Sequence, residues 1–135
     1  MSPVELRGKV LDEIAMAAHL ALVNDGVERS QVNKLIEVLE STHNVDYLLA
    51  HIARQVGRGI WGRSKSHYSA SKLFSLLKGR NVEEARTILG MFKWLYEAGL
   101  PKSWNLTNLA RELRLRPTAN AIEGFFYRYL ETVLR

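Results

Sequence analysis

The sequence predicts an all-α protein, a single compact bundle of six or seven helices spanning residues 1–135. Apolar residues recur at the 3.6-residue spacing of helices, whereas no segment alternates with the period of two that is typical of strands. Residue types that cap or end helices separate the apolar segments. The chain has 135 residues, 47% of them hydrophobic, which suits one domain with a buried core, and no repeat or long linker divides it.

The first predicted helix begins with residues 2–5, Ser-Pro-Val-Glu, which form a capping box with proline at the first helical position. It continues to about Val23, and residues 24–26 (Asn-Asp-Gly) predict a turn with positive φ. Apolar side chains surround the second half of this helix almost completely, so we expect it to lie at the centre of the bundle. A second helix begins near Ser30 and ends by Thr42.

Asn44 is placed to cap a third helix, in which apolar residues form one stripe. The opposite side of this helix carries His51, Arg54, Gln55 and Arg58, which should face away from the core. Residues 57–69 then break the periodicity with three glycines and three serines. We expect a loop there, one that could be mobile without a ligand.

Further helix boundaries follow from the second half of the chain. A short helix around Leu73 ends at residues 78–79, and Asn81 begins the next one. Gly99, followed by Pro101, should close that helix as a C-terminal glycine. Asn105 or Thr107 then caps a helix through Leu113, and residues 117–118 (Pro-Thr) precede a last helix that reaches the C-terminus.

Composition excludes several classes of protein. Without cysteine the chain has no disulfides, no thiolate metal sites and no cysteine nucleophile. Its most apolar stretch, Ile14 to Val23, is shorter than the roughly 20 residues needed to cross a bilayer. The N-terminal residues lack the basic region of a signal peptide. We therefore expect a soluble cytoplasmic protein with no membrane partner.

Charge is distributed unevenly along the chain. No acidic residue lies between Asp46 and Glu83, whereas the residues on either side are close to balanced. A concentration of one sign repels itself unless an anionic partner neutralises it, and phosphate backbones are common partners of this kind. The basic segment 47–82 therefore predicts nucleic-acid binding. Its lysines and arginines are Arg54, Arg58, Arg63, Lys65, Lys72, Lys78 and Arg80.

Residues 57–62, Gly-Arg-Gly-Ile-Trp-Gly, match the glycine spacing of a dinucleotide-binding loop. That loop follows a strand and needs an acidic residue about 20 positions later, and this sequence offers neither. Two alternatives remain open. The glycines either form a surface turn or let the backbone approach a phosphate beside Trp61, which could stack on a base. Trp61 on its own is more typical of a core residue.

No catalytic or metal-binding group stands out. His43, Asp46 and His51 lack a second nearby carboxylate and the spacing of metal ligands, so solvated histidines are the favoured interpretation. No serine lies in a nucleophile elbow. We expect no cofactor, no metal and no enzymatic activity.

Residues 105–134 have a pattern similar to a helix-turn-helix motif, with Ala110 at the expected crossing point. Arg114 stands where that motif usually has glycine, and Asn120 stands where an apolar residue is usual. A plain helical hairpin is therefore favoured. Arg111, Arg114 and Arg116 form a possible second basic patch.

Trp94 lies off the apolar stripe of its own helix, beside Thr87, Gly90 and Glu97. A large aromatic side chain in that position suggests that another surface covers it. That surface is either the terminal helix, which would place Trp94 in the core, or a neighbouring subunit.

Taken together, the chain resembles the small subunits of CRISPR effector complexes of the archaeal type I-A and type III kind. The resemblance covers residues 30–100 and lies in the size, the helical plan and three segments: 48–58 (LLAHIARQVGR), 70–77 (ASKLFSLL) and 92–98 (FKWLYEA). It implies a non-catalytic protein present in several copies side by side among other subunits. Such copies would hold guide RNA paired with its target, or the displaced DNA strand, through the seven basic residues of segment 47–82. Residues 102–135 have no match in that family.

Three functions are therefore considered. The favoured one is a sequence-independent nucleic-acid-binding small subunit of an RNA-guided complex, because the densest charge lies in segment 47–82. The second is a dimeric DNA-binding regulator that recognises its site with residues 105–126. The third is a protein–protein adaptor whose basic surface meets an acidic partner.

Overall fold

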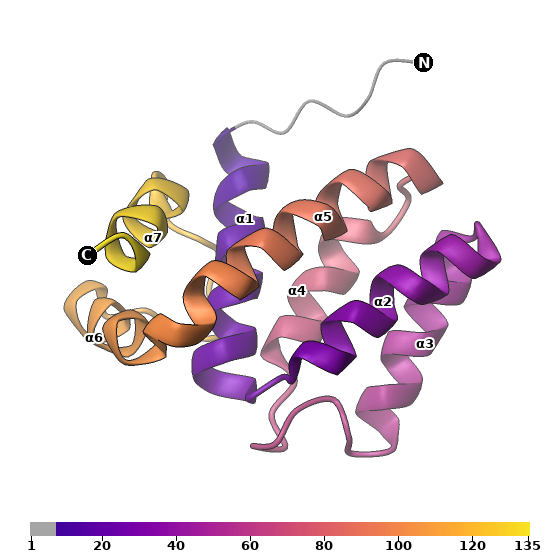
Figure 1. Ribbon diagram of the computed structural model, residues 1–135, viewed down its shortest axis with the longest axis horizontal. Coiled ribbons are helices and arrows are strands. Elements are labelled where there is room, and N and C mark those ends of the chain that lie inside the picture. Colours follow the sequence, from indigo (N-terminus) through magenta and orange to yellow (C-terminus); the bar gives the residue numbers. More distant parts are fainter. Residues whose placement is uncertain (1–7) are drawn as a thin grey trace.

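The all-α prediction is confirmed in the computed structural model, which describes residues 8–135 and contains no strand in that range (Figure 1). The helices are α1 (Gly8–His19), α2 (Arg29–Thr42), α3 (Val45–Gly57), α4 (Tyr68–Leu77), α5 (Val82–Gly99), α6 (Ser103–Leu113) and α7 (Phe125–Val133). A π-helical turn, η1 (Leu20–Asp25), extends α1, and a 3₁₀ turn, η2 (Leu100–Lys102), joins α5 to α6.

α1 lies at the centre of the bundle, as its apolar pattern predicts. It packs against α4, α5 and α7 (Figure 1), and its residues from Ile14 to Ala18 are at most 1% exposed. Three of these five residues are alanines, so neighbouring helices can approach the axis closely. α2 and α3 pack together on one side of α1, and α6 and α7 pack together on the other.

Several predicted helix ends are confirmed. Gly26 ends η1 in the left-handed region with φ 67°. The side chain of Asn44 accepts a hydrogen bond from the backbone N–H of Tyr47, and Asn81 forms a capping box with Glu84 at the start of α5. The capping box predicted at residues 2–5 lies outside the described residues.

The helix α5 ends at Gly99, as predicted, but Gly99 is not a left-handed C-terminal glycine: its φ is −83°, and the chain continues through η2 directly into α6. Glycine is needed there for space. A Cβ at this position would lie 2.2 Å from the Tyr129 hydroxyl, which donates a hydrogen bond to the carbonyl of Leu95. α6 also begins earlier than predicted, and Thr107 lies inside it with its hydroxyl donating to the Ser103 carbonyl.

The last helix begins at Phe125, well after the predicted start near residue 118. A carboxylate from the other end of the chain fixes this start. Asp12, on α1 and 6% exposed, accepts hydrogen bonds from the backbone N–H groups of Gly124 (3.0 Å) and Phe126 (2.9 Å). Its neighbour Glu13 accepts one from the N–H of Ala121 at 3.1 Å. Asp12 therefore caps α7 across the fold.

His19, near the end of α1, is buried without a hydrogen bond to its Nδ1 atom. It is 1% exposed, and its ring meets that of Phe125 edge-on with centroids 5.7 Å apart. Burial lowers the pKa of His19 from 6.5 to about 4, because the charged imidazolium would lose its hydration.

We therefore expect acidification to destabilise the fold through His19. Between pH 6.5 and about 4 the unfolded chain binds a proton that the folded chain excludes, so the free energy of unfolding falls as pH falls. From about pH 7.5 to about pH 5 the loss should be about 2 kcal/mol. Urea melts of the wild type and of His19→Leu, which cannot titrate, measure this contribution; equal losses in both proteins would contradict it.

Candidate nucleic-acid interface

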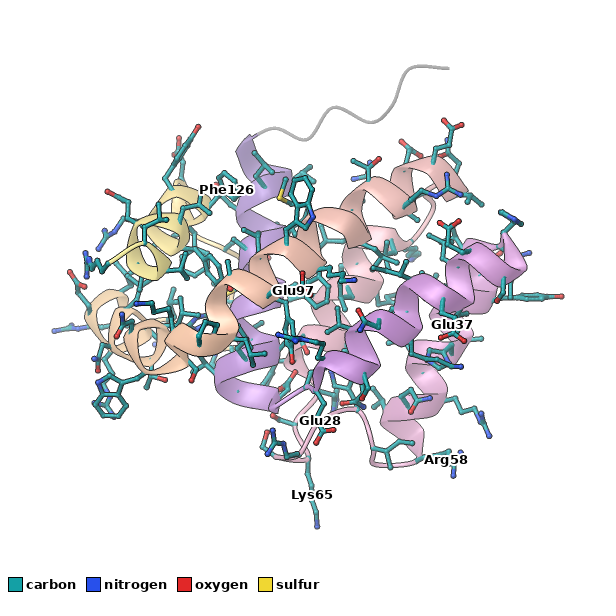
Figure 2. All side chains as sticks on the ribbon, in the orientation of Figure 1. Glu28, Glu37, Arg58, Lys65, Glu97 and Phe126 are labelled. Carbon is teal, nitrogen blue, oxygen red and sulfur yellow. The ribbon has the colours of Figure 1, made fainter. Side chains whose placement is uncertain are left out.

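The basic residues of segment 47–82 do not share one surface. Four of them, Arg54, Arg58, Arg63 and Lys65, lie in the second half of α3 or in the connection that follows it. Figure 2 shows Arg58 and Lys65 pointing away from the body of the protein at its lower edge. Residues 78 and 80 follow the opposite end of α4, a ten-residue helix about 15 Å long.

Lys72 does not belong to a binding surface, and its assignment to one is wrong. Its side chain is 13% exposed, and its Nζ lies 3.2 Å from Oε2 of Glu13, which is 16% exposed. This ion pair joins α4 to α1. Arg80 also interacts within the protein. Its Nε donates a hydrogen bond to the carbonyl of Leu76 at 3.2 Å, and its Nη1 lies 3.7 Å from Oε2 of Glu84. Lys78 is exposed, with its Nζ 5.9 Å from the centre of the Phe74 ring.

We call Arg54, Arg58, Arg63 and Lys65 the basic cluster. All four side chains are exposed. Within residues 8–135 only Arg63 among them has an ion pair, with Glu28 at 3.4 Å, and those two side chains are 79% and 54% exposed. An exposed pair of this kind is weak, so the cluster keeps most of its positive charge.

The connection from α3 to α4 is hydrogen-bonded to the turn that follows η1. The backbone N–H groups of Arg63 and Ser64 donate to the carbonyls of Gly26 and Asp25, both at 3.2 Å. The hydroxyls of Ser64 and Ser66 donate to the carbonyl of Asn24. The turn after η1 thus fixes the backbone that carries part of the basic cluster.

Asp25 holds this arrangement together, and it is fully buried. One carboxylate oxygen accepts from the Ser66 hydroxyl (2.6 Å) and from the N–H of Tyr68 (3.2 Å). The other accepts from the N–H and the hydroxyl of Ser69, at 2.6 and 2.5 Å. A carboxylate from η1 thereby satisfies backbone donors in the first turn of α4.

The glycine-rich residues 57–62 serve the same junction. Gly62 packs directly on the backbone of Asp25, where a Cβ would lie 2.1 Å from the carbonyl oxygen. Gly59 has φ 70°, the left-handed conformation that glycine adopts readily. Trp61 is 2% exposed and its Nε1 donates to the Ser69 hydroxyl at 2.9 Å, so the alternative in which it stacks on a base is wrong.

A groove between α2 and α3 adds residues that the sequence analysis did not connect. Lys34 on α2 and Arg54 on α3 both lie close enough to His51 to act on it. Burial lowers the pKa of His51, and the positive charges of Lys34 and Arg54 lower it further. The face of α3 predicted to point away from the core is confirmed for Arg54 and Arg58, while His51 is half-buried. Lys34 lies outside the basic segment, and only the packing of α2 on α3 brings it to the others.

His43, Asp46 and His51, which the sequence does not favour as metal ligands, do not form a cluster. His43 is exposed and ends α2 in the left-handed region with φ 50°. No group of three or more His, Asp or Glu side chains within residues 8–135 is arranged to hold a metal ion.

The helix-turn-helix interpretation is wrong for the part of the chain after α6. Eleven residues, 114–124, separate α6 from α7, whereas that motif uses a turn of three or four. Arg114 does take the left-handed conformation where glycine is usual, with φ 52°. Arg111, Arg114 and Arg116 are exposed, but they lie on the α6 side of the bundle, away from the basic cluster (Figure 1).

Trp94 is 70% exposed on α5, so the terminal helix does not cover it and the alternative that places it in the core is wrong.

No helix within residues 8–135 is long and apolar enough to cross a membrane. Comparison with known proteins finds no family model that matches the chain and no curated protein of similar sequence.

Proposed function

We propose that this protein binds nucleic acid through the phosphate backbone, without reading sequence and without catalysing a reaction. The observation that carries the proposal is the basic cluster: four exposed cations at one end of the bundle, three of them without a carboxylate partner within residues 8–135. Flexible arginine and lysine side chains on a fixed backbone suit phosphate contacts, which give affinity without base recognition.

Within this proposal, the resemblance to CRISPR small subunits suggests the setting, an RNA-guided complex in which the protein holds a guide–target duplex or a displaced DNA strand. The exposed Trp94 is then available for contact with a neighbouring subunit or a second copy. Copurification of the native protein from its host tests this setting. Bound RNA together with partner proteins supports it, whereas an acidic protein without nucleic acid supports the adaptor alternative.

Binding should depend strongly on salt and on the basic cluster. With about four phosphate contacts, the logarithm of the association constant should fall against the logarithm of salt concentration with a slope of about −3. Replacing Arg54, Arg58 and Lys65 together with Glu should weaken binding about thirtyfold or more at 0.1 M salt. Because these side chains are exposed, the melting temperature should move by only a few degrees. Fluorescence anisotropy with a labelled single-stranded oligonucleotide measures the affinity.

The matched control makes the same change of charge on the other side of the bundle, by replacing Arg111, Arg114 and Arg116 with Glu. That variant should keep most of the affinity. Equal losses in the two triple variants would show that overall charge, and not the basic cluster, determines binding. An affinity that does not change with salt would contradict the proposal altogether.

A further inference from the structure

The groove between α2 and α3 contains a cavity of about 220 Å³. Its walls are formed by Ser30, Gln31, Lys34, His51, Gln55 and Trp61. This volume is below the roughly 300–1,000 Å³ of pockets that hold drug-sized ligands, so it suits a single small polar group.

Three of these side chains have hydrogen-bonding capacity that the fold does not use. The hydroxyl of Ser30, the imidazole of His51 and the amide of Gln55 have no hydrogen-bond partner within residues 8–135. By contrast, the side chain of Gln31 is engaged at both ends, donating to the carbonyl of Ile60 and accepting from the N–H of Glu28. The indole of Trp61 is engaged with Ser69. Unused donors therefore face the cavity beside a lysine.

The charges around the cavity favour an anion. Lys34 and Arg54 both act on His51 and disfavour its protonation, and burial acts in the same direction. Lys34 forms an ion pair with Glu37 at 3.2 Å, and because both side chains are more than half exposed this pair is weak. Glu28, at the start of α2, lies beside Arg63. An anionic group in the cavity, beside Lys34, would offset this positive potential.

We propose that this cavity is a phosphate-binding site. One phosphate of the nucleic acid held by the basic cluster would bind there to Lys34, His51, Ser30 and Gln55. The inference rests on the proposed function for the identity of its ligand. A negative charge there offsets the positive charges of Lys34 and Arg54, which disfavour protonation of His51. His51 then takes up one proton from solvent as the phosphate binds and becomes a second charged donor.

The first experiment measures oligonucleotide affinity by fluorescence anisotropy at about pH 7.5 and about pH 5.5. Affinity should rise about fivefold or more at the lower pH, since one linked proton contributes up to about tenfold per pH unit. His51→Gln should remove this rise, and Lys34→Gln should weaken binding at both pH values. The matched control is His67→Gln, which removes an exposed histidine on the α3–α4 side and should leave the rise intact.

The second experiment uses inorganic phosphate and the wild-type protein, with the His51 ring signals followed by NMR as pH is varied. Phosphate should raise the pKa of His51, while the ring signals of His67 should not respond to phosphate. One outcome is that oligonucleotide binding needs Arg54 and Arg58 but does not depend on His51, and that His51 does not respond to phosphate. That outcome overturns the phosphate-binding site and leaves the proposed function standing. If His51 responds to phosphate but the protein does not bind oligonucleotides, the phosphate-binding site is supported and the assignment of nucleic acid as its ligand is overturned.

Discussion

Asp25→Ala should be the most damaging single substitution at the junction between η1 and α4, lowering the free energy of unfolding by about 4 kcal/mol. The carboxylate is fully buried and accepts four hydrogen bonds, two of them from backbone N–H groups of Tyr68 and Ser69. Its removal leaves those donors without a partner in the interior, where each costs about 1–3 kcal/mol. The melting temperature should fall by about 12 °C or more.

Denaturant melts of three proteins check this expectation. Asp25→Asn keeps an acceptor oxygen but presents an amide group to the Ser69 donors, so its loss should be intermediate. Glu123→Gln removes an exposed carboxylate and should change stability by less than about 0.5 kcal/mol. If Asp25→Ala were no more harmful than Glu123→Gln, the role assigned to Asp25 would be wrong.

Gly62→Ala should lower the free energy of unfolding by about 3 kcal/mol, because the added methyl group meets backbone and not a movable side chain. The new Cβ would lie 2.1 Å from the carbonyl oxygen of Asp25 and 2.9 Å from its carbonyl carbon. Relief of that overlap requires the connection before α4 to move away from η1. The hydrogen bonds of Arg63 and Ser64 to the same turn would then lengthen or break.

The same substitution at Gly57 provides a control of opposite sign. Gly57 is the last residue of α3, and a Cβ there meets nothing within 4 Å. Alanine has the higher helix propensity, so Gly57→Ala should be neutral or stabilise the protein by up to about 1 kcal/mol. Calorimetry of both variants separates an effect of space from a general effect of glycine; destabilisation of equal size at both positions would contradict the explanation.

Local sequence chemistry was sufficient to predict the fold class and most helix ends. Asn44, Asn81 and Gly26 act on residues a few positions away, so their roles follow from their neighbours in sequence. The start of α7 could not be predicted in this way, because its cap is Asp12, more than a hundred residues earlier. The role of Gly99 was mispredicted for a related reason. Glycine is required there because a Cβ would overlap the Tyr129 hydroxyl, which belongs to another helix.

The candidate site shows the same limit. The absence of acidic residues between positions 46 and 83 drew attention to this part of the chain, and four of the seven predicted residues form the basic cluster. The partner of Lys72, Glu13, lies on α1, where counting charges within the segment could not find it. Lys34 was missed because it joins the groove through the packing of α2 on α3, which leaves no signal in the spacing of either helix.

Because the carboxylates of α1 and η1 cap helices that begin much later in the chain, the order in which the protein is synthesised matters. Asp25 can make its hydrogen bonds only after the start of α4 has been synthesised, and Asp12 only after residues 124 and 126, more than a hundred positions later in the chain. Before those residues are synthesised, the helices that cover α1 are incomplete, so its alanine-rich surface stays exposed. The growing chain therefore cannot complete this core in stages, and we expect the helical bundle to gain and lose its structure as one cooperative unit.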